Sequence, residues 1–196
     1  MRVTREQAAE NRDRVLETAA RLFRERGFGG VGVAELMNEA GLTHGGFYGQ
    51  FESKDDLKAQ ACEQAAARTL QRWRDAAAKA PENGLAALVA AYVTPSHRDH
   101  PGTGCVVAAL GEDARREGPK VRHALSDAAR SLLDTLVEVA PGKTRAQRRQ
   151  RAAVTLASMV GAIVLARAVD DEGLSNEILR AVKAAHTQPP RADQPA

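Results

Sequence analysis

The fold is decided by one stretch, Val33-Ala-Glu-Leu-Met-Asn-Glu-Ala-Gly-Leu-Thr-His-Gly-Gly-Phe-Tyr-Gly-Gln-Phe51. Its first half has apolar residues at helical spacing, namely Val33, Leu36, Met37 and Ala40. Gly41 ends this short helix, and Thr43 has the side chain of an N-cap for a third helix that runs to Gly49. Two short helices joined by a glycine-containing turn are typical of a helix-turn-helix.

Helical patterns continue on both sides of this stretch. Thr4-Arg-Glu-Gln7 has the pattern of a capping box and predicts a helix that ends at Gly27. Ser53 and Asp56 predict the start of a longer helix. Further helices are predicted over residues 85–93, 105–116, 119–139, 145–169 and 174–186, with a break over 94–104. The sequence therefore predicts an all-α fold of about nine helices.

This order of helices suggests a division of the chain by role. We expect a helix-turn-helix domain over residues 1–52, a second helical domain over 53–187, and a disordered tail over 188–196, which is rich in Pro, Ala and charge.

Composition sets the broad class of protein. A hydrophobic content of 43% is enough for a buried core, and aromatic residues make up only 4%. The charged N-terminus leads into no apolar segment, so we expect a cytoplasmic protein. The net charge of +3 is compatible with nucleic-acid binding. However, residues 1–60 hold nine Lys/Arg and ten Asp/Glu, so any basic surface depends on where these side chains point.

The outer face of the third predicted helix is unusual. Once Leu36, Leu42, Phe47 and Phe51 form the inner face, the residues left outside are Thr43, His44, Gly45, Gly46, Tyr48, Gly49 and Gln50. Three glycines each cost roughly 1 kcal/mol in a helix relative to Ala, so helix stability does not explain them. Either the backbone closely approaches a phosphate or base edge, or the glycines only extend a loop.

Two further side chains suit a phosphate partner. Tyr48 can donate its hydroxyl to a phosphate, although a half-buried surface tyrosine is the alternative. Lys54 lies in the first turn of the next predicted helix, where a cation opposes the helix dipole. A phosphate nearby explains Lys54 better than helix stability does.

The chain resembles the TetR family of bacterial repressors between about Arg12 and Leu57. The motifs are Ala19-Ala-Arg-Leu-Phe23, Arg26-Gly-Phe28, Val33-Ala-Glu-Leu36, Ala40-Gly-Leu-Thr-His-Gly-Gly-Phe-Tyr48, Phe51 and Ser53-Lys-Asp-Asp-Leu57. The resemblance implies a dimeric, all-helical repressor with a variable ligand-binding domain. It also implies the role of each matching residue: Thr43, His44 and Gly46 face DNA, Tyr48, Gln50 and Lys54 contact DNA or its phosphates, and Phe47 and Phe51 are core.

The sequence departs from the family pattern in two places. Val31 and Gly32 occupy positions where the family commonly has hydroxyl residues at the start of the second helix, so a phosphate contact and an N-cap are expected to be missing. Gln50 occupies a position where His is frequent, and Gly49 before it is unusually small. These departures affect the operator sequence and affinity rather than the fold.

The helix predicted over residues 145–169 is apolar on nearly all sides after Ala152. Arg167 and the many Ala and Gly residues argue against a membrane span. Small residues form a ridge, and larger ones supply bulk: Ala153, Ala157, Gly161, Leu156, Val160, Ile163 and Val164. An internal core helix is one interpretation. The resemblance implies a homodimer in which the last two helices pair with their copies, which would set two recognition helices about 34 Å apart on a pseudo-palindromic operator.

The resemblance also implies a small-molecule effector bound between Leu57 and Val139. By residue type, the candidates for its pocket are Trp73, Tyr92, His97, His100, Cys105 and Leu110. For each of them, core packing or surface exposure is the alternative. We expect no cofactor and no metal, because His97 and His100 have no further clustered ligands.

Three alternatives remain at this stage. One is an all-helical DNA-binding or interaction protein without ligand control. Another is a small enzyme that uses the His97 to Cys105 loop, although no catalytic motif accompanies these residues. The third is a redox-responsive regulator that uses Cys62 or Cys105, the latter at a predicted helix start.

Overall fold

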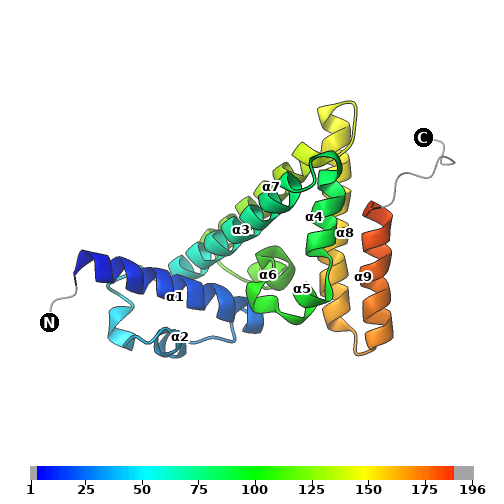
Figure 1. Ribbon diagram of the computed structural model, residues 1–196. Helices are drawn as coiled ribbons and strands as arrows, with labels where there is room; N and C mark the ends of the chain where they lie inside the picture. Colours follow the sequence, from blue (N-terminus) through cyan, green and yellow to red (C-terminus); the bar gives the residue numbers. More distant parts are fainter. Residues whose placement is uncertain (1–3, 188–196) are drawn as a thin grey trace. The chain divides into compact units, whose positions relative to one another are not determined.

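The computed structural model describes residues 4–187 of the 196-residue chain and contains no strand within that range (Figure 1). The helices are α1 (Arg5–Arg26), α2 (Val33–Glu39), α3 (Lys54–Ala78), α4 (Gly84–Tyr92), α5 (Pro95–Asp99), α6 (Val106–Ala114), α7 (Pro119–Val139), α8 (Arg145–Ala168) and α9 (Glu172–Thr187). Short 3₁₀ turns lie at His44–Gly46, Pro81–Asn83 and Pro101–Thr103. The predicted all-α fold is confirmed, and the tail predicted over 188–196 lies outside the described residues.

The chain forms two compact units. The first unit contains the described residues up to 69 and residues 100–130, and the second contains residues 70–99 and the described residues from 131 onward. Both α3 and α7 contribute residues to each unit. This division follows contacts along and across helices, whereas the boundary expected after residue 52 is a division by role and stays a prediction.

The first unit is built on the apolar stripe of α1. Val15, Ala19 and Phe23 are fully buried in one core with residues of α2, α3, α6 and α7. The Thr4 hydroxyl accepts the predicted hydrogen bond from the Gln7 backbone N–H at 3.2 Å. The helix ends at Gly27, whose positive φ of 75° favours glycine and whose N–H donates to the Phe23 carbonyl.

The third helix of the helix-turn-helix is not an α-helix, which corrects the prediction. His44–Gly46 forms a single 3₁₀ turn, and non-helical turns continue to Gln50. Thr43 precedes the turn, but its side chain makes no capping hydrogen bond. The physical reason is the three glycines at positions 45, 46 and 49, whose low helix propensity leaves too few residues to propagate an α-helix.

The start of α3 is held by ion pairs that are partly buried within the first unit. Ser53 accepts a hydrogen bond from the Asp56 backbone N–H at 3.0 Å, as its capping position predicts. The buried Asp56 carboxylate in turn accepts from Lys120 Nζ at 2.6 Å. Lys58, also buried, pairs with Glu117 just before α7. These pairs fix the first turn of α3 against the start of α7.

The break predicted over residues 94–104 is more structured than expected. It contains the five-residue helix α5 and the 3₁₀ turn Pro101–Thr103. A proline begins each of them, because proline needs no partner for a backbone N–H at the first helical position. The Thr94 hydroxyl also accepts a hydrogen bond from the His97 N–H at 3.1 Å.

In the second unit, α8 packs against α9 and α5, and α9 also packs against α4. Figure 1 shows α8 and α9 side by side in orange and red. A full capping box of Thr144 and Gln147 begins α8. Among the described helices, α8 is long and apolar enough to cross a membrane by length and composition, a test that the core helix of a soluble protein also passes.

Candidate nucleic-acid interface

Two buried phenylalanines anchor the segment Thr43–Gln50 to the core of the first unit. Phe47 and Phe51 are buried, and their rings stack with centroids 5.6 Å apart. Tyr48 points outward with 71% of its surface exposed, and His44 packs edge-on against its ring at 6.3 Å. Because Phe47 and Phe51 are buried while Tyr48 is exposed, the outer face of this segment is free to contact a partner.

Glycine at position 45 is not required by the chain itself. A Cβ built on Gly45 would meet no atom within 4 Å, and its φ is not positive. A Cβ on Gly46 would lie 3.6 Å from Met37, which is ordinary contact. Neither a steric clash nor the backbone conformation therefore requires glycine at position 45.

A hollow of about 350 Å³ lies beside this segment. Its lining consists of Arg12, Tyr48, Gly49, Gln50, Phe51, Glu52, Asp56 and Gln60. The side-chain oxygen of Gln50 is buried there without a hydrogen-bond partner among the described residues. A buried carbonyl that lacks a donor has lost its hydration, so an outside donor or water would stabilise it.

Arg12 is a candidate that the sequence analysis missed. Its guanidinium lies 4.7 Å from the centroid of the Phe51 ring, and it donates to Gln60 Oε1 at 2.5 Å. It forms no ion pair within residues 4–187. The contact with Gln60 spans 48 residues, so no local pattern in the sequence could have predicted it.

Lys54 stands at the start of α3 as a half-buried cation. Burial lowers the pKa of its amine, and the neighbouring Lys58 lowers it further, while Glu117 and Asp55 act in the opposite direction. Lys54 itself forms no ion pair with the described residues. An anion beside it would favour the charged amine, which supports the predicted phosphate contact.

Several acidic residues of this region form ion pairs within the chain. Glu35 pairs with Arg26 and Glu39 pairs with Arg21, both on the surface. Gly32 is the N-cap of α2 and provides no side-chain hydrogen bond, so the expected missing cap is confirmed. Arg12 and Lys54 near the exposed segment form no ion pair with the described residues, although the net charge of residues 1–60 is near zero.

The predicted ligand-binding residues separate into two groups. Trp73, Tyr92 and His97 form a ladder of edge-to-face rings in the second unit, with centroids 5.7 Å and 4.4 Å apart. Cys105 and Leu110 belong to the first unit, where both are buried. His100 is exposed.

His97 is held in its neutral form. Its Nδ1 lies 2.9 Å from the Tyr92 carbonyl oxygen, and burial lowers the pKa of its imidazole from 6.5 to about 4. The hydrogen bond to Tyr92 opposes this shift, whereas Arg167 and Arg72 add to it. At neutral pH, the ring ladder therefore contains an uncharged imidazole.

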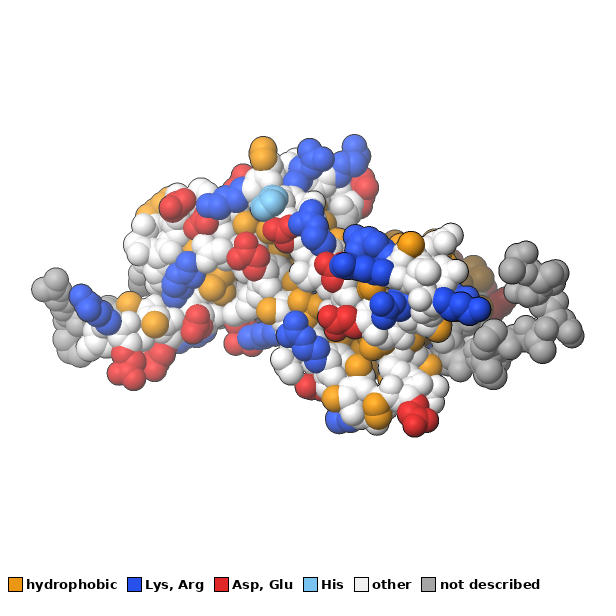
Figure 2. Space-filling model, turned by 90° about the horizontal axis from the view of Figure 1, so that it is seen from above, with side chains coloured by type: hydrophobic (Ala, Val, Ile, Leu, Met, Phe, Trp, Pro, Cys, Tyr) orange, Lys and Arg blue, Asp and Glu red, His pale blue; other side chains and the backbone are white. Residues whose placement is uncertain are grey.

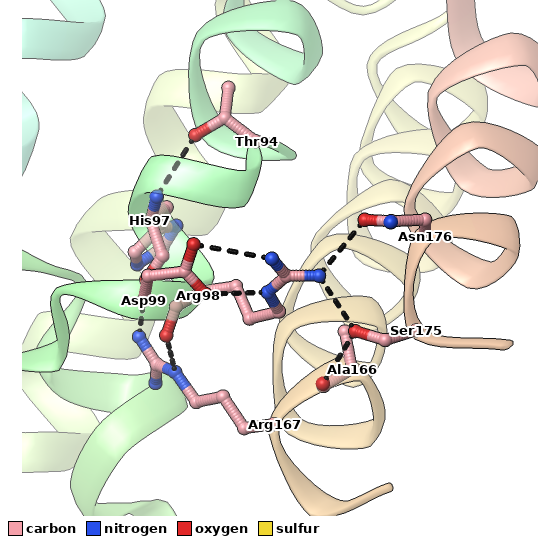
Figure 3. Close-up of polar contacts among 8 residues, drawn as sticks. All are labelled: Thr94, His97, Arg98, Asp99, Ala166, Arg167, Ser175 and Asn176. Carbon is pink, nitrogen blue, oxygen red and sulfur yellow. Dashed lines mark hydrogen bonds and ion pairs between the residues drawn. The ribbon is translucent and has the colours of Figure 1, made fainter. Parts of the chain in front are cut away.

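A polar cluster fixes α5 to α8 and α9 (Figure 3). We define the Arg98 cluster as Arg98, Asp99, Arg167, Ser175 and Asn176. The Arg98 guanidinium donates to Asp99 at 2.6 Å and to Ser175 and Asn176 at 2.9 Å. Arg167 donates to the Arg98 carbonyl at 3.0 Å and also to the preceding carbonyl at 2.6 Å. Side chains of both α8 and α9 therefore hold α5 in position.

The described residues offer little support for a redox-active cysteine or a metal site. Burial raises the pKa of the Cys62 thiol to about 12, so it is not a thiolate at neutral pH. Cys105 is also buried. No group of three His, Cys, Asp or Glu side chains within residues 4–187 could hold a metal ion.

One face of α8 is apolar and exposed. Ala153 and Ala157 are exposed, Val164 is 44% exposed, and Leu156, Val160 and Gly161 are half-buried. Ile163 is fully buried inside its own unit, so its assignment to a dimer surface is wrong. The prediction also missed three exposed apolar residues, Val154, Leu165 and Leu174. Helical spacing cannot show which side of an all-apolar helix the chain covers.

A basic surface lies where α7 gives way to α8. Residues 143–151 include five Lys/Arg and no acidic residue. Figure 2 shows Lys and Arg side chains gathered there on the face seen from above. Of these, Arg149 pairs with Asp134 at 2.9 Å. The exposure of this run agrees with a solvated start of α8.

Known proteins resemble this chain at two levels. Residues 15–61 match the model of the bacterial regulatory proteins of the tetR family. The chain is 32% identical over 95 residues to the HTH-type transcriptional regulator YerO from Bacillus subtilis, a match covering 46% of this chain and 32% of YerO. It is 31% identical over 87 residues to the HTH-type transcriptional regulator AcrR from Shigella flexneri, covering 44% and 40%. The matches thus span about a third to two fifths of these curated relatives.

The likeness in structure extends over nearly the whole chain. The crystal structure of the reduced form of NemR from Escherichia coli has a TM-score of 0.75 and is 25% identical, covering 90% of this chain and 94% of that protein. The family match therefore covers the Thr43–Gln50 segment, and the structural match covers the helices that follow it.

Acid should destabilise the chain partly through His97. Between about pH 6.5 and pH 4 the unfolded chain binds more protons than the folded chain, so stability falls as the pH is lowered through this range. We expect His97→Gln to remove this contribution, on the order of 2 kcal/mol. Urea unfolding at a series of pH values measures it. The control is the exposed His123→Gln, and identical pH slopes for His97→Gln and the wild type would contradict the prediction.

Proposed function

Since the chain belongs to the TetR family of bacterial regulatory proteins, we propose that it is a homodimeric transcriptional repressor that binds a pseudo-palindromic DNA operator and is released by a small-molecule effector. One observation gives the DNA-binding proposal its main support. The Thr43–Gln50 segment exposes Tyr48 and a bare glycine backbone directly above the buried Phe47 and Phe51.

In this proposal the segment enters the major groove. Thr43, His44, Gly45 and Gly46 face the base edges, where small residues let the backbone come close. Gln50 offers its amide beside them, and its buried carbonyl oxygen accepts a donor from a base amino group or water.

Phosphates are contacted at the margins of the segment. Tyr48 donates its hydroxyl, and Lys54 supplies a cation that forms no ion pair with the described residues. Arg12 joins them from α1, because its stacked guanidinium lines the same hollow as Tyr48. Such contacts fix the position of the protein on DNA without specifying sequence.

The first test is binding to the intergenic DNA upstream of the protein's own gene across a salt series. We expect tight, salt-sensitive binding that is weaker for Tyr48→Phe and Gly45→Ala. Lys54→Ala should reduce the slope of log K against log salt by about 1, because one phosphate contact is lost. Fluorescence anisotropy of labelled DNA measures all of these.

The controls separate DNA contact from folding. Lys79→Ala removes an exposed cation at the end of α3 and should keep the wild-type slope. Gly45→Ala should unfold like the wild type, because its Cβ meets no atom. Wild-type affinity in Tyr48→Phe, Gly45→Ala and Lys54→Ala alike would refute the proposed interface.

The homodimer is supported by the exposed apolar face of α8, with Leu174 at the start of α9. Ala153, Ala157 and Gly161 form its low ridge, and Val154 and Leu165 are more than half exposed. Apolar groups at this density on one surface favour burial against a second copy. Small residues let the partner helix approach closely.

A charge on this face should separate the two copies. Ala157→Glu places a carboxylate where the partner helix would remove its water, so we expect the dimer to dissociate at concentrations where the wild type stays dimeric. Sedimentation equilibrium measures the change. The matched control is Ala67→Glu on an exposed position of α3. A dimeric Ala157→Glu would exclude this face.

For the effector, the supporting feature is the ladder of Trp73, Tyr92 and His97. Two aromatic rings and a neutral imidazole suit a ligand with flat apolar surface and a hydrogen-bonding group. Cys105 and Leu110 are buried in the other unit, so we base the proposal on these three residues alone.

The single tryptophan of the chain gives a direct readout of this site. A compound that releases the protein from its operator should change Trp73 emission over the same range of concentration. Release without any change in emission would exclude the ladder as the effector site. His97→Ala should weaken the compound's effect on both signals.

A further inference from the structure

A second small site lies in the second unit, at the joint between α4 and α5 and along α9. It is a groove of about 260 Å³. Its lining residues are Val93, Pro95, Asn176, Leu179, Arg180 and Lys183. None of them belongs to the Trp73–Tyr92–His97 ladder or to the Thr43–Gln50 segment.

The floor of this groove is apolar. Val93 and Leu179 are buried to within 2% and 4% exposure, and Pro95 is an exposed wall. A cavity of about 150 Å³ is enough for benzene, so this groove has room for one aromatic ring with a short substituent. Its floor would give such a ring a surface away from water.

The rim of the groove on α9 is positively charged. Arg180 and Lys183 are three residues apart and therefore lie on one face of the helix. Glu177 is placed to pair with Arg180 at the same spacing, yet Arg180 forms no ion pair with any described residue. Its planar guanidinium suits a carboxylate, which can accept two parallel hydrogen bonds.

We propose that this groove binds a small amphipathic carboxylate, with its ring over Val93, Pro95 and Leu179 and its carboxylate at Arg180. Lys183 adds a second positive charge beside the carboxylate. The site does not depend on the proposed DNA-binding function.

Asn176 links the groove to the Arg98 cluster. It lines the groove, and its side-chain oxygen accepts a hydrogen bond from Arg98 at 2.9 Å. A bound carboxylate therefore changes the surroundings of the residue that ties α5 to α9. The side-chain amide of Asn176 is therefore a reporter placed within the groove itself.

The test is an NMR titration of the full chain with cinnamate and, separately, with its neutral amide. We expect cinnamate to shift the Asn176 side-chain amide resonance in a saturable way, with the neutral amide binding roughly fivefold more weakly. Arg180→Gln should weaken cinnamate binding by roughly three- to tenfold, because a charged hydrogen bond at a partly exposed site is lost.

Arg145→Gln is the matched control, because it removes the same charge from an exposed position of the same unit outside the groove. It should bind cinnamate as the wild type does. Equal affinity for cinnamate and its amide, unchanged binding by a folded Arg180→Gln, or no shift of Asn176 up to about 5 mM cinnamate would each overturn the proposal.

Discussion

The exposed segment depends on the burial of two aromatic rings. Residues 44–50 contain one 3₁₀ turn and no α-helix, and backbone hydrogen bonds such as those from Gln50 and Phe51 to the Phe47 carbonyl hold the turns that follow. Phe47 and Phe51 join these turns to the core, because each ring is buried and the two rings stack on one another. Tyr48, which lies between them in the sequence, is exposed.

Ion pairs at the start of α3 hold the chain just after the two phenylalanines. Asp56 holds the backbone N–H of Glu52 at 3.3 Å and receives Lys120 on its other oxygen. Lys58 pairs with Glu117 nearby. Removal of Lys120 or Glu117 would take the main partner from the buried Asp56 or Lys58, so these pairs are sensitive points. They give α7 a direct contact with the residues that follow the exposed segment.

The sequence was sufficient to predict elements with strong local patterns. Capping residues and glycines placed the ends of α1, α7 and α8 to within a residue or two, and Phe47 and Phe51 were correctly predicted as core. It failed where tertiary contact decides the outcome. Ile163 and Val164 are adjacent and similar in type, yet one is buried and the other exposed. Arg12 and Gln60 meet only because α1 and α3 pack together.

Because the space around Gly45 is open, folding and binding place independent demands on this position, although in most positions they constrain each other. In a buried position, a new side chain must fit its neighbours before it can do anything else. At position 45 an added Cβ touches nothing in the chain. A substitution at position 45 is therefore constrained by what the segment binds and hardly by the fold. The binding specificity of related chains can change at this position at almost no cost in folding free energy.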